Sequence, residues 1–439
     1  MNQQEELNQP KNNSTSGTIM DQQERIVVGL DIGTTKVCAV VGSIDSQDRT
    51  HILGVGKAPS DGLNRGVVVN IDKTVNAIQT AIEQAELASG IEVNSVNVGI
   101  AGDHIRSMRS KGVITISNKG NEITAEDVER LLEDCKQIML PTDQQIIHVI
   151  PQEFVVDGQD GISDPVGMSG MRMEAEVHII TGLVSAAKNI YRCVERAGYQ
   201  VADIILEPLA SSYSVLADEE KEAGVVLVDI GGGTTDVAIF QDNTIRHTAV
   251  IAIAGKKVTD DIRVGLSVLH DQAEKLKCNH GEAYAAMIED DETITVPGIA
   301  GRPPKEITKS ILAKIIQARM EEILEIVAIE TKRSGYADSL SAGVVSTGGG
   351  SLIGNLCPLI NEVMGMDAKI GTPLGLSGGM TEEVNNPIYA TGVGLVMHAI
   401  RTEDGTGKQA MIPSTSKGSN VEEVMNRIAE RMKSWFKEL

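Results

Sequence analysis

Two matched stretches of the sequence carry residue types that could cradle a phosphate group. In each, an apolar run ends at an aspartate, glycine and threonine follow, and a second apolar run begins, which predicts a β-hairpin with an unusual turn. Glycine permits positive φ and lets backbone N–H groups approach an anion, and threonine adds hydroxyl donors. Either turn alone could be an ordinary glycine-containing hairpin, but two matched copies argue against that interpretation. The residues are Asp31, Gly33, Thr34, Thr35 and Lys36 in the first stretch, and Asp229, Gly231, Gly232, Gly233, Thr234, Thr235 and Asp236 in the second.

The charged residues of these turns suggest how a metal–phosphate group would be held. Asp31 and Asp229 stand at predicted strand ends. Because Mg²⁺ keeps much of its hydration, both carboxylates could hold this ion through water molecules. Lys36 has two interpretations, as an ordinary solvated lysine of a hairpin or as a cation beside a phosphate site.

Two further segments could approach a ligand. Gly348, Gly349 and Gly350 lie between the strand-like residues 344–347 and a predicted helix start, where a helix N-terminus can receive an anionic group. This cluster is weak evidence alone, because connections between strands and helices often contain glycine. Glu207 comes directly before Pro208, which suits a first helical position, so Glu207 is expected at the positive end of a helix.

These motifs need a scaffold of alternating strands and helices. From about residue 26 to residue 400, strand-like and helix-like stretches alternate, which predicts an α/β architecture. The duplicated hairpins indicate two related halves with a cleft between them. The polar composition of residues 1–24 predicts a flexible tail, and the Gly, Ser, Thr and Lys content of 401–419 predicts a linker.

Composition and charge exclude several classes of protein. The 439 residues carry a net charge of −22, which repels phosphate polymers and argues against nucleic-acid binding. Hydrophobic residues make up 41% and charged residues 23%, as in ordinary folded proteins, and no apolar run is long enough to span a bilayer. Five scattered cysteines without a secretory signal indicate a reducing cytosol.

The motifs together resemble those of the actin, Hsp70 and sugar-kinase ATPase superfamily. The shared features are the two phosphate hairpins, the Glu-Pro segment between them, a TGGG segment, and a closing helix with small residues. The finer pattern is closer still to the FtsA family of bacterial cell-division proteins, over about residues 25–400 and the terminal helix. The matching stretches are DIGTTKVCAVVG from Asp31, HVIPQEFVVDG from His148, EPLASSYSVL from Glu207 and AGKKVTDDIRVGL from Ala254.

The resemblance implies an actin-like, two-lobed α/β fold that binds ATP and Mg²⁺ between its lobes. The two turns would be phosphate loops, Gly255 and Asp261 would belong to the nucleotide site with Asp261 on the ribose side, and the Gly348–Gly350 cluster would lie under the adenosine. Glu207 falls where a water-orienting catalytic residue would lie. Family members vary in hydrolysis, so the resemblance leaves a weak or regulated ATPase activity open.

The resemblance also implies a division of the chain into segments. An FtsA-type subdomain would be inserted in the first lobe, and a small subdomain in the second. The expected segments are a tail (1–24), first lobe (25–96), inserted subdomain (97–182), first lobe (183–224), second-lobe core (225–259), second-lobe small subdomain (260–334), second-lobe core (335–385), closing helix (386–400), linker (401–419) and amphipathic helix (420–439).

The family's partners give expectations for the surface. In the family, the small subdomain of the second lobe receives the acidic and hydrophobic C-terminal peptide of the tubulin-like protein FtsZ, so Arg302, Lys309 and Arg319 are expected contacts. The inserted subdomain contacts neighbouring protomers and other division proteins, and the protein forms filaments.

The C-terminal segment predicts an amphipathic helix. Its apolar residues form one stripe, and the only Trp of the chain lies in that stripe, which suits an anchor at a lipid interface. The alternative is a helix docked on the body or on a partner. The membrane-facing residues would be Val424, Met425, Ile428, Met432, Trp435, Phe436 and Leu439.

The overall expectation is an ATP-binding, polymerising protein on the cytoplasmic face of the inner membrane that tethers FtsZ at the division site. One alternative is an actin-like scaffold of pilus assembly, which would be expected to lack the terminal helix. A small-molecule kinase of the same fold would need an acceptor pocket with a catalytic carboxylate. A chaperone like Hsp70 is disfavoured, because the segment after residue 400 is too short for a substrate domain.

Overall fold

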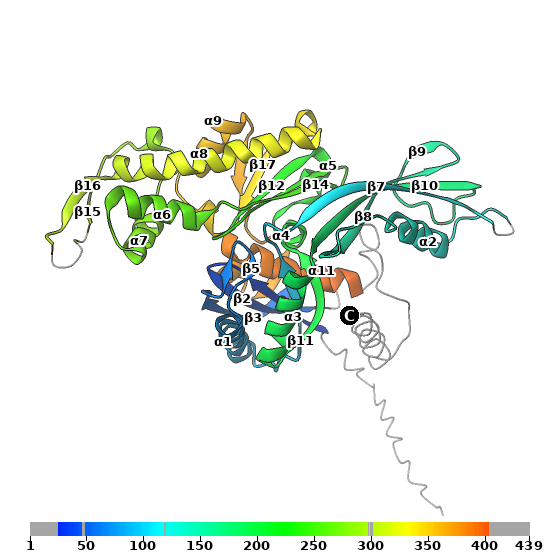
Figure 1. Ribbon diagram of the computed structural model, residues 1–439, viewed down its shortest axis with the longest axis horizontal. Coiled ribbons are helices and arrows are strands. Elements are labelled where there is room, and N and C mark those ends of the chain that lie inside the picture. Colours follow the sequence, from blue (N-terminus) through cyan, green and yellow to red (C-terminus); the bar gives the residue numbers. More distant parts are fainter. Residues whose placement is uncertain (1–24, 46–48, 118–119, 297, 299–301, 404–439) are drawn as a thin grey trace, which may run out of the picture.

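The computed structural model contains two lobes and a smaller subdomain that projects from one side (Figure 1). The predicted tail and amphipathic helix lie outside the described residues, as does the predicted linker beyond residue 403. The described residues are 25–45, 49–117, 120–296, 298 and 302–403.

The first lobe is built on a six-stranded sheet with the hairpin β1–β2 in it. Both strands are almost continuously apolar, because helices cover both faces of the sheet. The helices α1 (Ile71–Ser89) and α3 (Val184–Ala197) pack on one face, and α11 (Ala390–Glu403) packs on the other. In spatial order the strands are β11 (Gln200–Leu206), β6 (Ser95–Ile100), β1 (Arg25–Ile32), β2 (Lys36–Ile44), β3 (Thr50–Pro59) and β19 (Leu376–Gly379).

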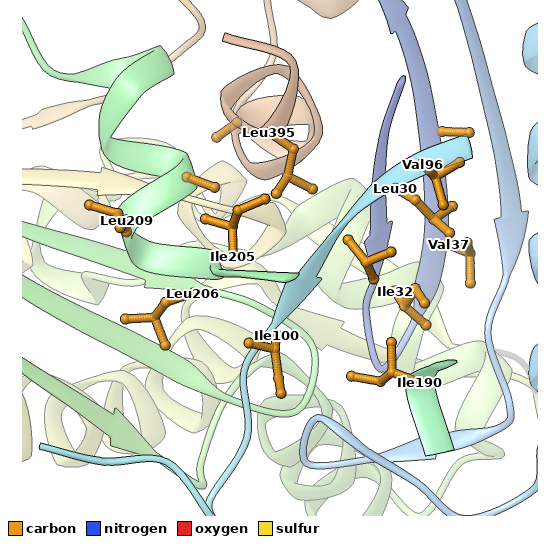
Figure 2. Packing of buried hydrophobic residues seen from close by; sticks show 14 of the residues in the cluster. Leu30, Ile32, Val37, Val96, Ile100, Ile190, Ile205, Leu206, Leu209 and Leu395 are labelled. Atoms are coloured by element: carbon orange, nitrogen blue, oxygen red, sulfur yellow. The ribbon is translucent and has the colours of Figure 1, made fainter. Parts of the chain in front are cut away.

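The core of the first lobe holds the hairpin firmly up to its turn. Figure 2 shows Ile32 and Val37, the residues that flank the first turn, among the aliphatic side chains of neighbouring elements. Ile32 is 3% exposed and Val37 is fully buried. The turn between them therefore starts and ends at anchored positions.

The second lobe repeats this arrangement. Its hairpin β12–β13 is antiparallel like β1–β2, and β17 runs parallel to β12 as β6 runs parallel to β1. The predicted duplication is therefore confirmed in the sheet topology. In spatial order the five strands are β14 (Thr244–Ile251), β13 (Thr235–Gln241), β12 (Val225–Ile230), β17 (Val344–Thr347) and β18 (Ala368–Ile370).

Helices cover the outer face of the second sheet. The long helix α8 (Lys309–Ser334) runs beside the sheet, at the top of Figure 1, and shares one core with α6 (Gly255–Leu266) and α9 (Leu356–Met364). The helix α7 (His270–His280) and the hairpin of β15 (Thr293–Val296) and β16 (Lys305–Thr308) complete this end of the lobe.

The inserted subdomain has a core of its own and a four-stranded sheet. Strand β6 pairs with β1 in the first lobe, so the insertion starts after Ile100 and not at the predicted residue 97. It contacts the second lobe through Ser107, whose hydroxyl donates to the carbonyl of Thr248 over 3.0 Å. Its elements are β7 (Arg106–Thr115), α2 (Ala125–Cys135), β8 (Gln144–Val156), β9 (Gln159–Ile162) and β10 (Arg172–Leu183).

The remaining elements are short. The strand β19 joins the first sheet through β3, so part of the predicted second-lobe segment 335–385 belongs to the first lobe. None of the helices in the described ranges is long and apolar enough to cross a membrane. The short elements are β4 (Leu63–Asn64), β5 (Val67–Val68), α5 (Asp218–Ala223), α10 (Thr381–Val384) and the 3₁₀ helices Ala285–Met287, Ala337–Ser339, Gly349–Leu352 and Pro387–Tyr389.

Two helices cross closely where the lobes meet. A Cβ atom on Gly394 of α11 would lie 1.9 Å from the carbonyl oxygen of Ala210 in α4 (Glu207–Val215). The backbones of α4 and α11 therefore touch, and a glycine is required at this point. By contrast, a Cβ atom on Gly392 would meet only side chains, the nearest being a methyl of Val40 at 2.9 Å.

This crossing predicts opposite tolerance at two glycines of one helix. Alanine favours the helix by about 1 kcal/mol over glycine at either position. At residue 394 it also collides with backbone, so Gly394→Ala should lower the free energy of unfolding by about 1–3 kcal/mol. Gly392→Ala is the matched control and should be close to neutral in urea unfolding. Equal midpoints for the two variants would contradict the close crossing.

Candidate functional site

The two hairpin turns have the same backbone geometry. In the first turn, the N–H of Gly33 donates to the carbonyl of Lys36 over 2.9 Å, and in the second the N–H of Gly231 donates to the carbonyl of Thr234 over 3.0 Å. Each turn follows a buried strand that ends just after an aspartate. The sequence repeat is thus a repeat of local structure.

The two turns lie directly against each other across the lobes. A Cβ atom on Gly232 would lie 2.3 Å from Cγ2 of Thr35, and one on Gly233 would lie 2.4 Å from Oγ1 of Thr34. Glycine permits positive φ, but Gly33, Gly231, Gly232 and Gly233 do not adopt it. Glycine is needed at 232 and 233 because the opposite turn leaves no room for a side chain.

An ion pair neutralises the charge of the first turn. Nζ of Lys36 lies 2.6 Å from Oδ2 of the buried Asp31. Burial alone would lower the pKa of Lys36, but the carboxylate of Asp31 outweighs burial and raises this pKa above its ordinary value. Lys36 is therefore a charged, half-buried partner of Asp31.

The carboxylates of the second turn are buried, and their hydrogen bonds do not fully offset the cost of burying their charge. Oδ2 of Asp229 accepts hydrogen bonds from the hydroxyls of Ser211 at 2.9 Å and Thr391 at 3.3 Å, yet burial raises the pKa of Asp229 to about 6. Oδ2 of Asp236 accepts a hydrogen bond from Thr234, whereas its Oδ1 is buried without a partner. Burial and the charge of Asp229 raise the pKa of Asp236 above its ordinary value.

Glu207 stands at the start of α4 and faces the same carboxylates. Its side chain lies against Gly99 of β6, where a Cβ atom would be 2.8 Å from Cγ of Glu207. The residue before it is fixed by His148, whose Nε2 accepts the N–H of Leu206 over 2.9 Å. Burial, and then the charges of Asp31, Asp236 and Asp229, raise the pKa of Glu207 well above its ordinary value.

The third glycine cluster lies beside the second turn. Gly348 has a φ of +80°, and a Cβ atom there would lie 2.2 Å from Oδ1 of Asp229. Gly349 begins a 3₁₀ helix, and the α-helix follows only at Leu356. The residues that come directly after this cluster line a cavity of about 540 Å³. Its lining consists of residues 351–358, Ile370, Thr372 and residues 385–387.

The start of α6 is fixed to the second turn. The N–H groups of Gly255 and Lys256 donate to the carbonyls of Gly231 at 3.1 Å and Gly232 at 2.9 Å. Gly255 was predicted as a site residue, whereas Lys256 was not, although it lies in the AGKKVTDD stretch. The roles of Ser211, Thr391 and His148, which contact Asp229 or the residue before Glu207, could not be predicted either, because contacts between distant segments leave no local pattern.

The structure pairs two of the predicted residues with each other. Asp261, expected at the ribose, accepts hydrogen bonds at 2.6 and 3.2 Å from Arg319, expected at the partner peptide. Arg319 also contacts Glu322. Lys309 forms an ion pair with Glu282 at 2.8 Å, and Arg302 is exposed. The structure does not bring these four residues together with the two turns through any hydrogen bond or ion pair.

A magnesium–phosphate group would fit the chemistry between the turns. Four acidic side chains repel one another there, and one oxygen of Asp236 has no partner, so a cation would relieve the repulsion. Within the described ranges, no three His, Cys, Asp or Glu side chains converge to ligate a metal directly. A cation held through water, as expected at Asp31 and Asp229, needs no such cluster.

The fold and the paired turns define the class of protein. The chain has an actin-like ATPase fold. Several solved structures share this fold at low sequence identity. The PilM–PilN type IV pilus biogenesis complex is 15% identical, with a TM-score of 0.64 over 85% of this chain and 98% of that one. MreB5 of Spiroplasma citri bound to ADP is also 15% identical, with a TM-score of 0.53 over 87% of this chain and 99% of that one.

Closer relatives identify the family. The chain is 44% identical to the cell division protein FtsA of Pseudomonas aeruginosa, over 94% of this chain and 98% of the relative, and 38% identical to that of Escherichia coli, over 94% and 96%. The model of cell division protein FtsA matches residues 226–394, and that of the SHS2 domain inserted in FtsA matches 102–181. The chain belongs to the FtsA family of cell division proteins.

The carboxylate cluster predicts a stability that falls as pH rises. A carboxyl group whose pKa is raised in the folded protein holds its proton more tightly there than when unfolded, so stability is lost as pH rises through the folded pKa. Asp236→Asn removes one such charge. It should raise the free energy of unfolding of the metal-free and nucleotide-free protein by about 1–3 kcal/mol at pH 8.

The gain should shrink toward pH 4, where the wild-type carboxyl also carries its proton. Chemical unfolding in EDTA at several pH values measures the difference. Asp134→Asn, at an exposed position of α2, is the matched control and should change little at any pH. A gain from Asp236→Asn that does not depend on pH would contradict the electrostatic explanation.

Proposed function

We propose that the chain binds Mg-ATP between the two hairpin turns. The observation that carries this proposal is the pair of matched turns in contact across the lobes, with glycines that admit no side chain on the facing surfaces. Backbone N–H groups and threonine hydroxyls of both turns would hold the phosphates, and Lys36 would add positive charge. The ADP-bound and AMPPNP-bound structures of MreB5, which share this fold, support the proposal.

Asp31 and Asp229 would hold the magnesium ion through water. When bound, the ion supplies positive charge that lowers the mutual repulsion of the carboxyl groups. Glu207 would orient a water molecule toward the terminal phosphate, and His148 would keep Glu207 in place through Leu206. The residues Gly348–Gly350 and the adjoining cavity would receive the adenosine. Gly255, which is bonded to the second turn, and Asp261, on the ribose side, would complete the nucleotide site.

The chain would act in division as a membrane tether for FtsZ. Membership of the FtsA family supports a role in division, and the sequence pattern of residues 420–439 supports an amphipathic anchor. Its apolar stripe could contribute about 5–10 kcal/mol before ordering costs. One helix would then bind weakly, and a filament with many helices would bind strongly, because neighbours raise each other's effective concentration.

The small subdomain of the second lobe would receive the acidic peptide of FtsZ. Arg302 is exposed, whereas Lys309 and Arg319 already pair with Glu282, Asp261 and Glu322. A peptide carboxylate must compete with these internal acids. Binding would therefore be moderate and would weaken with salt.

Gly232→Val tests the phosphate site. The new side chain collides with Thr35, so it must displace the turn against which the phosphate would lie. ATP affinity measured by calorimetry should fall about a hundredfold, or about 3 kcal/mol. Wild-type circular dichroism and a similar unfolding temperature serve as the control for folding. A folded variant with unchanged affinity would refute the site.

Trp435→Glu tests the membrane anchor. It places a charge in the apolar stripe and should weaken sedimentation with vesicles of anionic lipids by about tenfold or more. Ser434→Glu adds the same charge on the opposite side of the predicted helix and should bind nearly as wild type. If both variants sediment with the vesicles as well as the wild type does, the segment is a docking element and not a membrane anchor.

A further inference from the structure

Lys256 joins the two hairpin turns of the two lobes. It is the second residue of α6, and its backbone N–H donates to the carbonyl of Gly232, which fixes the residue to the second turn. Its side chain reaches the first lobe, where Nζ donates to the carbonyl oxygen of Thr34 over 3.0 Å. One residue is therefore bonded to both turns.

The partners of Lys256 differ from those of Lys36. The ammonium of Lys36 is paired with the carboxylate of Asp31. Among the residues that the structure describes, no carboxylate lies within ion-pair distance of Lys256, and the acceptor of its ammonium is a neutral carbonyl. An arriving anion could thus engage Lys256 without breaking an ion pair.

The contact between the turns makes this bond sensitive to what lies between them. There is no room for even a methyl group between Gly232 and Thr35. A phosphate group placed between these two residues would therefore move the turns apart and would lengthen the bond from Lys256 to Thr34. The backbone bond to Gly232 keeps Lys256 at the second turn during this movement.

We propose that Lys256 is a positioning residue that acts as a latch between the lobes. Without a nucleotide, its ammonium holds the first turn through Thr34. When a nucleoside triphosphate binds, the ammonium moves from this carbonyl to the terminal phosphate, which is the stronger acceptor because it is charged. A nucleoside diphosphate lacks this third phosphate, so the ammonium would find no new acceptor. The second half of the proposal rests on the proposed ATP site, and the first half does not.

Hydrogen exchange in the nucleotide-free protein tests the latch itself. Lys256→Met keeps the aliphatic stem and removes the ammonium, so exchange at the amides of Gly33, Gly231 and Gly66 should speed up about tenfold. The N–H of Gly66 is informative because it donates to Oγ1 of Thr34. Lys257→Met is the matched control, because Lys257 is exposed, lies next to Lys256 in the chain and faces Asp260. This variant should exchange as the wild type does.

Lys256→Arg keeps the charge and should restore most of the protection, which separates loss of the latch from general loosening. Amides in the centres of β1 and β12 should be unaffected in every variant. Wild-type exchange at the turns of Lys256→Met would overturn the latch. Uniformly faster exchange through both sheets would also overturn it, since the residue would then be merely structural.

Nucleotide affinities test the transfer to phosphate. Lys256→Met should weaken ATP binding about tenfold and ADP binding less than twofold, while Lys257→Met should change neither. An equal loss for both nucleotides, or no loss for either, would overturn the transfer. If the wild type binds neither nucleotide, the proposed ATP site and the transfer are wrong, and the exchange experiment still decides the latch.

Discussion

The close crossing of α4 and α11 is the constraint on which the rest of the site depends. Because the carbonyl of Ala210 occupies the space of a Cβ on Gly394, the two backbones are fixed relative to each other. From this crossing, Ser211 of α4 and Thr391 of α11 both reach Oδ2 of Asp229 in the other lobe. Glu207 begins the same α4 helix. One contact thus sets the positions of Asp229 and Glu207 and holds the two lobes together where α4 and α11 cross.

The buried acidic side chains near the two turns repel one another, and a ligand with positive charge would relieve this repulsion. Burial raises the pKa of Asp229, Asp236 and Glu207, and their charges reinforce this effect, whereas Lys36 is already paired with Asp31. Folding of the ligand-free chain therefore opposes ionisation of these groups. A bound cation would offset that cost, so affinity for a metal–phosphate group and stability of the folded chain would be thermodynamically linked.

The sequence was informative where a function depends on local pattern. Aspartate, glycine and threonine at a strand end predicted both turns, and their duplication predicted two similar sheets. It failed where contacts join distant segments. The φ values at Gly232 and Gly233 are ordinary, because their glycines are required by the opposite turn and not by their own backbone. The roles of His148 and Lys256 likewise depend on partners in other elements, and the strand β6 crossed a predicted border because strand pairing is non-local.

The chemistry of Glu207 bears on what nucleotide binding would accomplish. Burial and the neighbouring carboxylates raise the pKa of Glu207, which favours its protonated form, whereas positive charge nearby would favour the carboxylate that can accept a hydrogen bond from water. Turnover would then depend on how the cleft closes around the ligand. The α4–α11 crossing is a close contact between two backbones, whereas the contact between the turns consists of side chains of the first turn, glycines of the second and the Lys256 bond. A nucleotide bound between the turns, as proposed, would therefore change the angle between the lobes mainly at the contact of the two turns.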